Sequence, residues 1–269
     1  MADETTVLLN ENRRLRRETR LLRQRIEAFE GSRWWRLHPR FLVRRRPLTH
    51  AADADVTPFE PSSFAAIRES SIRSASIVAP AVHEIVSASS VVDVGGGEGW
   101  WGAEFARLGA RTVSIDKGAA TELAPGVEHV AHDLRRGLPE GIGRFDLALC
   151  LEVAEHLEPR AGERLVAALR SLSSVVLFSA AIPGQGGQGH LNEQWPRYWV
   201  DRFEQCGFSC SAALRWRFWS DDRVASWYRQ NLLFCTADVR RFPALFETPL
   251  ADPLPVVHPV TFARAINTS

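Results

Sequence analysis

The chain has 269 residues, a hydrophobic fraction of 45% and a formal net charge of +1. This length suits one sizeable α/β domain with an appendage, and the near-neutral charge gives no overall reason to expect a nucleic acid as partner. The four cysteines, Cys150, Cys206, Cys210 and Cys235, show no metal-ligand pairing, so we expect reduced thiols in a cytoplasmic protein. No run approaches the roughly 20 apolar residues that span a bilayer, and the start lacks a signal-peptide pattern.

Residues 4–30, within an N-terminal segment at 1–31, are predicted to form one coiled-coil helix. Large apolar residues recur every seven positions, at Leu8, Leu15, Leu22 and Phe29. With these at d, Asn12 lies at an a position, and the e and g positions hold the oppositely charged pairs Glu11 with Arg16, Glu18 with Arg23 and Arg25 with Glu30. This pattern favours a parallel dimer or docking to a partner enzyme. The polar a positions leave a solitary solvated helix as the alternative.

The next segment, residues 32–63, combines a basic-aromatic stretch with a linker. Residues 33–46 interleave arginines with tryptophans, a composition that suits contact with an anionic membrane surface or a partner protein. A nucleic-acid arm and simple packing on the following domain are alternatives. From residue 47 onwards, Pro, Ala, Asp and Ser dominate, which is typical of a linker.

The central stretch, residues 89–117, has the pattern of a strand, a glycine turn, a helix and a second strand. The valine-rich run at 91–94 predicts a buried parallel strand, and it ends at three successive glycines. A helix is predicted over about residues 100–108, and a strand over 112–115 that leads to Asp116. Glycines allow the backbone to turn sharply and approach a ligand, and the start of the helix offers free N–H groups.

An acidic residue inside the first strand separates two cofactor classes that use this plan. Gly97, Gly99 and Gly102 fit the G-x-G-x-x-G pattern of dinucleotide-binding proteins, but that match alone is weak. The fuller pattern Asp93-x-Gly95-x-Gly97-x-Gly99 resembles the first motif of class I S-adenosylmethionine-dependent methyltransferases. A glycine turn that binds nothing is the alternative.

This resemblance implies an α/β fold, with a Rossmann-like, mostly parallel seven-stranded sheet and helices on both faces, over residues 64–240. In the family, the strand acid and the glycines of the motif hold the methionine moiety of S-adenosylmethionine, and the acid after the second strand, here Asp116, holds the ribose hydroxyls. The other strands are predicted at 127–134, 145–151, 175–179, 214–219 and 232–237, and the other helices at 64–87, 161–171 and 198–206.

The resemblance also assigns residues after the third and fourth strands to the cofactor site. Asp133 and the amide of Leu134 are expected to meet the adenine; the alternative is that Asp133 caps a turn before Arg135. Glu152 is expected to line the cofactor pocket, and His156 to pack and hydrogen-bond locally rather than act as a base.

Residues 180–199 are the expected acceptor site, because binding residues concentrate on loops carried by a rigid scaffold. The first half is rich in glycine, and the second half combines amides and aromatic planes, at Asn192, Gln194, Trp195 and Tyr198. Such side chains suit a sugar, which stacks on one face and is hydrogen-bonded at its edge. The alternative is that the aromatic residues only pack the loop onto the sheet.

The same loop holds the expected catalytic residues. His190 is the first candidate for a general base, because the ordinary pKa of histidine, about 6.5, lies near neutral pH. Glu193 is the second candidate, either as a base or as the group that orients His190. A loop histidine that bonds only to the backbone is the alternative. No acid cluster forces a metal site, so no metal ligands are predicted; a divalent metal that aligns a diol of the acceptor is the alternative.

The stretch from His190 to Trp199 is similar to a subgroup of methyltransferases associated with cell-surface glycan or glycosylated natural-product clusters. The resemblance implies methylation of a sugar hydroxyl of a glycan, nucleotide sugar or glycosylated metabolite, in the cytoplasm or at the inner membrane surface. A methyltransferase of another small metabolite, at nitrogen or oxygen, and a non-catalytic scaffold that uses the coiled coil are the alternatives. The proline-containing tail, residues 241–269, is expected to run as an extended surface wrap.

Overall fold

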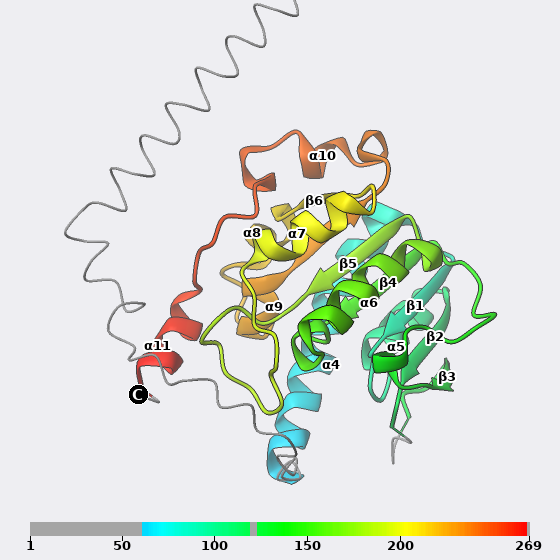
Figure 1. Cartoon of the computed structure of the whole chain (residues 1–269), viewed down its shortest axis with the longest axis horizontal. Coiled ribbons are helices and arrows are strands. Elements are labelled where there is room, and N and C mark those ends of the chain that lie inside the picture. Colours follow the sequence, from blue (N-terminus) through cyan, green and yellow to red (C-terminus); the bar gives the residue numbers. More distant parts are fainter. Residues whose placement is uncertain (1–60, 119–122, 268–269) are drawn as a thin grey trace, which may run out of the picture. The chain divides into compact units, whose positions relative to one another are not determined.

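The computed structural model of the chain describes residues 61–118 and 123–267 (Figure 1). The predicted coiled coil at residues 4–30, the basic-aromatic segment at 33–46 and the linker up to residue 60 lie outside the described residues. The described residues form one sheet with helices on both of its faces.

Seven strands form this sheet in the order β3-β2-β1-β4-β5-β7-β6. They are β1 (Ser90–Val94), β2 (Arg111–Asp116), β3 (Val127–Ala131), β4 (Leu147–Leu151), β5 (Val175–Ser179), β6 (Ser209–Ser211) and β7 (Leu233–Thr236). The first five strands are parallel, and β7 is antiparallel to both of its neighbours, β5 and β6. The predicted Rossmann-like, mostly parallel sheet is therefore confirmed, and the carboxyl ends of its five parallel strands lie along one edge.

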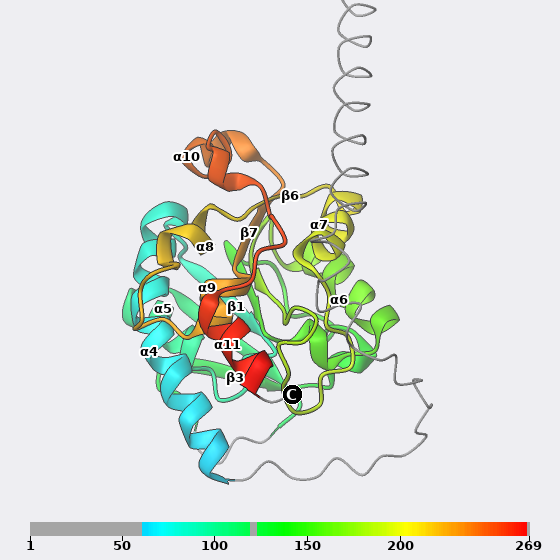
Figure 2. The same ribbon diagram turned by 90° about the vertical axis from the view of Figure 1, so that its left-hand side faces the viewer.

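Helices cover both faces of the sheet (Figure 2), and each face has its own apolar core. The helices α4 (Pro61–Val86), α5 (Trp100–Arg107), α8 (Ala213–Phe218) and α9 (Ser226–Asn231) supply one core, and α6 (Pro159–Leu172) and α7 (Pro196–Gln205) supply the other. Val91 and Val92, adjacent in β1, belong to opposite cores, because successive side chains of a strand point to opposite faces. β4 and β5 are buried throughout, as expected of strands covered on both faces.

The helix predicted over residues 64–87 is α4, and it covers the sheet as expected. Its buried residues, Ala75, Val78, Ala79, Val82 and Val86, recur at the three- and four-residue spacing of one helix face. Even this helix of 26 residues is not apolar enough to cross a membrane, and neither is any other helix in the described part of the chain.

The sixth strand lies earlier in the chain than predicted. Residues 214–219 were expected to form it, but β6 is Ser209–Ser211, and the aromatic run after it forms α8. Leu214 and Phe218 are both buried and lie four residues apart, so they share one face of the helix. The seventh strand, predicted at 232–237, is confirmed as β7.

The tail contains short helices, contrary to the expected extended wrap. They are the α-helices α10 (Pro243–Phe246) and α11 (Pro259–Asn267) and the 3₁₀ helix η4 (Pro249–Ala251), and another 3₁₀ helix, η3 (Val239–Arg241), leads into the tail. Pro243, Pro249 and Pro259 each begin a helix, because the first helical position needs no N–H donor and suits the fixed φ of proline. The tail is also fastened to the domain, since Gln230 donates a hydrogen bond to the carbonyl of Val256.

Two of the four cysteines form a disulfide, contrary to the expectation of reduced thiols. Cys210 of β6 lies directly opposite Cys235 of β7, and their sulfur atoms are bonded. Cys150 and Cys206 are free thiols. A separation of 25 residues does not reveal strand register in the sequence, so the pair could not be foreseen. The expectation of a reducing compartment therefore loses the support that the cysteines gave it.

Candidate functional site

The glycine turn between β1 and α5 is tied to the end of β2 through Asp116. One carboxylate oxygen of Asp116 accepts a hydrogen bond from the amide of Gly97 at 3.1 Å, and the other accepts one from the amide of Gly118 at 3.2 Å. Gly97 has a φ of 55°, and a Cβ atom built there would meet no described atom within 4 Å. The turn therefore presents its backbone to open space beside a carboxylate.

Gly96 lies so close to buried polar groups that a side chain at this position would collide with them. A Cβ atom at Gly96 would lie 2.4 Å from Oδ2 of Asp93 and 2.6 Å from Oγ of Ser114. Both of these oxygens are buried, and neither has a hydrogen-bond partner within the described part of the chain. A polar ligand bound at the turn would supply the missing partners, so these residues fit the cofactor expected from the sequence.

Burial strongly perturbs the Asp93 carboxyl, which is 2% exposed. The pKa of this carboxyl is raised to about 7: removal from water is the main cause, a hydrogen bond from the amide of Gly102 partly opposes it, and the nearby charge of Asp116 adds to it. The carboxyl of Asp93 therefore changes from its protonated to its charged form near neutral pH.

A cavity of about 220 Å³ lies at the carboxyl ends of the first three strands. Its lining consists of Gly97, Asp116, Gly118, Leu123, His129, Val130 and Ala131. His129 was not among the predicted site residues. Its ring lies under the glycine turn, since a Cβ atom at Gly99 would be 2.8 Å from its Cε1, and its buried Nε2 has no partner among the described residues. The position of His129 in a strand gave no signal for this role.

Asp133 caps the 3₁₀ helix η1 (Leu134–Arg136), which is the alternative considered for it. Its carboxylate accepts hydrogen bonds from the amide and the guanidinium of Arg135. These bonds hold the pKa of Asp133 well below its usual range. Neither Asp133 nor Leu134 lines the cavity, and the Leu134 side chain packs in the core. Their contact with adenine stays a prediction.

Glu152 turns the chain out of β4 in a conformation that is uncommon for a residue other than glycine. Its φ is 56°, and its amide donates to the carbonyl of Ser179 at 2.9 Å. The carboxylate accepts hydrogen bonds from Gln185 and Asn231, both at 3.1 Å. Burial raises the pKa of Glu152, and these hydrogen bonds partly oppose the rise. Asn231 also donates to Gln185 at 2.9 Å, so the residues before β7 contact the acceptor loop.

The acceptor loop folds around the carboxylate of Glu193. The amides of Gly184 and Gly186 donate to it at 2.8 and 2.9 Å, and Nδ1 of His190 lies 2.9 Å from its Oε1. Burial acts to raise the pKa of Glu193, but the bonds from His190 and the two amides outweigh it, so the pKa lies below the ordinary value. The expected catalytic pair is thus hydrogen-bonded, and the alternative of a histidine bonded only to the backbone does not hold.

The four expected substrate-binding residues divide into two kinds. Asn192 is 2% exposed and accepts a hydrogen bond from Gln194. The hydroxyl of Tyr198 donates to Glu163 of α6, and a guanidinium stacks on its ring. These contacts favour a packing role for Tyr198. Trp195 is 36% exposed, so its indole remains open to a ligand.

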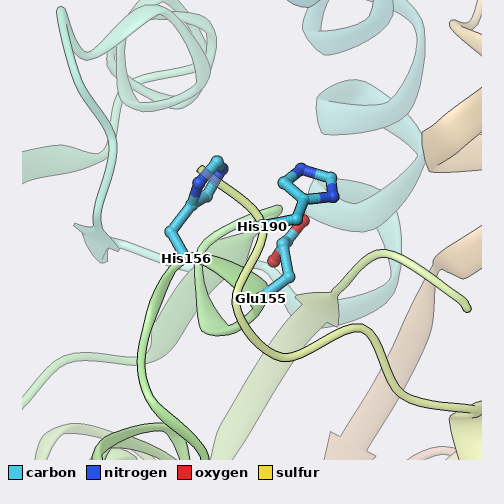
Figure 3. A group of neighbouring side chains, drawn as sticks. All are labelled: Glu155, His156 and His190. Atoms are coloured by element: carbon cyan, nitrogen blue, oxygen red, sulfur yellow. The ribbon is translucent and has the colours of Figure 1, made fainter. Parts of the chain in front are cut away.

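His190 also belongs to a second group of side chains (Figure 3). One ligand atom each from Glu155, His156 and His190 lies within 4.8 Å of the others. The two imidazole rings meet edge to face, with centroids 4.9 Å apart. Burial, and then the charge of Glu152, raise the pKa of Glu155. The group combines residues that follow β4 and β5, which is why no local cluster in the sequence indicated it.

The Asp93 carboxyl should make the unfolding free energy depend on pH. Between its ordinary value of 3.8 and about 7, the folded state keeps the proton that the unfolded state releases, so stability falls as pH rises through this range. The loss should be on the order of 4 kcal/mol. Asp93→Asn should remove it, as measured by urea unfolding of the cofactor-free protein from pH 4 to pH 8.

Asp146→Asn is the matched control for this measurement. Hydrogen bonds from Ser89 and Ser90 lower the pKa of Asp146. The stability that they contribute is therefore present above the unfolded-state pKa and is lost as pH falls, which is the opposite trend. If the Asp93→Asn variant and the parent gave parallel curves of stability against pH, the assignment of the Asp93 shift would be wrong.

Comparison with known proteins identifies the family of this chain. The family model of a methyltransferase domain matches residues 64–221, more than half of the chain. No curated protein matches the sequence. A putative O-methyltransferase from Nostoc punctiforme shares the fold at a TM-score of 0.50 and 13% identity; the alignment covers 70% of this chain and 63% of that one.

Two other solved structures lie below a TM-score of 0.5. The mitomycin 7-O-methyltransferase has a TM-score of 0.46 and 16% identity, and the alignment covers 62% of this chain and 53% of that one. The 1,6-didemethyltoxoflavin N1-methyltransferase of Burkholderia thailandensis has a TM-score of 0.45 and 20% identity, and the alignment covers 71% of this chain and 96% of that one. The chain thus spans less than two thirds of the length of the first two structures. The match over residues 64–221, with the glycine turn and Asp116 inside it, shows that the chain belongs to the methyltransferase-domain family.

Proposed function

We propose that this methyltransferase modifies a sugar hydroxyl of a glycan, nucleotide sugar or glycosylated metabolite. The observation that carries the proposal is the hydrogen-bonded pair of His190 and Glu193 in the glycine-rich loop after β5. That loop is joined to the cofactor side of the sheet, because Gln185 of the loop donates to Glu152 after β4.

The cofactor is assigned to the residues of the first motif together with Asp116 and Glu152. The two oxygens of Asp116 each keep a lone pair for a ribose hydroxyl, since each accepts one amide hydrogen bond. On the methionine side, Asp93 and Ser114 each supply one partnerless oxygen, and the glycine turn supplies open backbone at Gly97. Asp133 and Leu134 stay in the proposal as the adenine contacts, because they follow Ala131, the last residue along the chain that lines the cavity.

Two glycine substitutions test this cofactor site. Gly96→Ala should cost roughly 1–3 kcal/mol of stability, because the new methyl group meets buried oxygen atoms, and S-adenosylhomocysteine should bind more weakly by at least about tenfold. Gly102→Ala is the matched control, since its methyl group would lie 3.6 Å or more from its nearest neighbours inside α5 and alanine favours a helix. Unfolding in urea and calorimetric titration measure both effects. Unchanged affinity in Gly96→Ala would contradict the site.

In the proposed mechanism the chain positions an acceptor hydroxyl and takes its proton. Bound S-adenosylmethionine supplies an electrophilic methyl group. Nδ1–H of His190 donates to Glu193, which leaves the lone pair of Nε2 for the proton of the acceptor. Glu193 keeps its charge because its pKa is lowered, so it holds the ring in this tautomer and stabilises the imidazolium form. A base of this kind contributes roughly 10²- to 10⁴-fold to the rate.

Sugar recognition is assigned to the second half of the loop. Trp195 offers an exposed indole plane, and Gln194 and Asn192 offer amides. Stacking on the plane and hydrogen bonds at the edge match a hydroxylated ring. Tyr198, near the start of α7, is assigned a supporting part in sugar recognition. Its hydroxyl donates a hydrogen bond to Glu163, so its ring borders the loop in a fixed position.

Methylation of a panel of acceptors tests the proposed substrate. Nucleotide sugars and glycosides should accept a methyl group, and phenols, carboxylates and heterocyclic nitrogens should not. Glu193→Gln should lower kcat by about 10-fold or more, because the neutral amide no longer stabilises the imidazolium. Glu104→Gln is the control, since this carboxylate bonds to Arg107 within α5 and not to any residue of the acceptor loop, and its kcat should match the parent. A phenol or nitrogen acceptor as the sole substrate would overturn the sugar assignment.

The proposal keeps a self-association role for residues 4–30 and a membrane-surface role for residues 33–46, in the cytoplasm. Their support is the heptad spacing and the alternation of arginine with tryptophan in the sequence. Light scattering of the full chain should give the mass of a dimer, and sedimentation with anionic vesicles should carry the protein down. A monomeric mass would contradict the dimer, and protein left in the supernatant would contradict the membrane contact.

A further inference from the structure

Three side chains that follow two neighbouring strands converge beside the acceptor loop (Figure 3). Glu155 and His156 end the 3₁₀ helix η2 (Ala154–His156), which follows β4, and His190 lies in the loop after β5. The main chain fixes their relative positions, because the carbonyl of Glu155 accepts hydrogen bonds from the amides of Leu191 at 2.7 Å and Asn192 at 3.0 Å. The two loops are therefore joined at this point through their main chains.

The carboxyl group of Glu155 is buried, and one of its two oxygens has no hydrogen-bond partner within the described part of the chain. The residue is 0% exposed, and its Oε1 accepts one bond, from the amide of Ala181 at 3.2 Å. Its Oε2 is the oxygen without a partner among the described residues. An unpaired buried carboxylate is costly, and a cation would relieve this cost.

Both histidines are held in the way that metal-binding histidines are held. Nδ1 of His190 lies 2.9 Å from the Glu193 carboxylate, and Nδ1 of His156 lies 3.3 Å from the carbonyl of Gly189. When Nδ1–H donates to such an acceptor, the ring orientation is fixed and Nε2 carries the free lone pair. Each ring thus has one nitrogen available as a ligand.

We propose that Glu155, His156 and His190 bind a divalent transition-metal ion such as Zn²⁺, through Oε2 of the glutamate and Nε2 of each histidine. Two imidazoles and one carboxylate suit zinc or its neighbours, whereas Mg²⁺ and Ca²⁺ prefer oxygen ligands alone. Three protein ligands leave a coordination position open. His156 is exposed, so this position is reachable from solvent.

The consequence for methyl transfer rests on the proposed function. With the ion bound, Nε2 of His190 is a ligand and no longer accepts a proton. The ion lowers the pKa of an acceptor hydroxyl in the open position, and the proton leaves to water. The oxygen then bonds to the methyl carbon, and the carbon–sulfur bond breaks with its electron pair on sulfur. The free His190–Glu193 pair and the bound ion are thus two alternative means of activating the same hydroxyl.

Titration of tag-free full-length protein, stripped with a chelator, tests the site without any acceptor. Co²⁺ should produce visible absorption bands that saturate at one equivalent, and Zn²⁺ should displace it. His156→Ala and Glu155→Gln should each weaken Co²⁺ binding by at least about tenfold, and Glu193→Gln should weaken it less but measurably. His132→Ala is the control, because this ring bonds to the Gly137 carbonyl away from the site, and its titration should match the parent.

Calorimetry with S-adenosylhomocysteine checks that each variant remains folded and binds the cofactor. Absence of saturable Co²⁺ binding, or equal binding in the parent and in His156→Ala, would overturn the metal site. Failure of the proposed function is a separate result: saturable binding lost in His156→Ala, together with no methylation of any sugar acceptor, would overturn the sugar assignment and leave the metal site intact. If the stripped protein methylated a sugar acceptor but showed no saturable Co²⁺ binding, the metal site would be overturned and the sugar assignment would stand.

Discussion

The covering of both faces of the parallel sheet is the constraint on which the rest of the molecule depends. Because helices seal the two faces, polar chemistry is restricted to the edge where the parallel strands end. Asp116, Glu152 and the acceptor loop all follow the carboxyl ends of strands in this sheet. The backbone must turn sharply at each of these points. At Glu152 the turn requires a φ of 56°, a conformation that residues other than glycine seldom adopt.

The two halves of this edge are built by different means. On the β2 side, the amide of Gly97 in the glycine turn and the amide of Gly118 after β2 converge on one carboxylate, Asp116, which ties the turn to the end of β2. On the β5 side, a loop without regular structure converges on Glu193 in the same way, through amides and a histidine. Glu152 and Gln185 connect the two halves. A carboxylate therefore organises each loop, and this explains why acidic residues recur along this edge of the sheet.

The sequence predicted the first part of the fold because its signals there are local. The strand, the glycine turn, α5 and Asp116 follow one another within 89–117, and the four-residue spacing in α4 extends over a long helix. Where elements are short, the period cannot be read: Leu214 and Phe218 suited a strand as well as one turn of helix. Contacts between distant parts of the chain could not be predicted either, because they depend on which strands become neighbours in the sheet. Asn231 reaches Glu152 across 79 residues, and Glu155 meets His190 only because their strands are neighbours.

The disulfide between Cys210 and Cys235 closes the segment between these residues into a covalent ring near the end of the domain. The segment between them contains α8, α9 and Asn231, so the side chain that holds Glu152 lies inside a covalently closed ring. A protease that cut the surface turn between α8 and α9 would leave the two fragments attached to each other. The strand pair β6–β7 would then remain joined, and the cut would appear only after reduction.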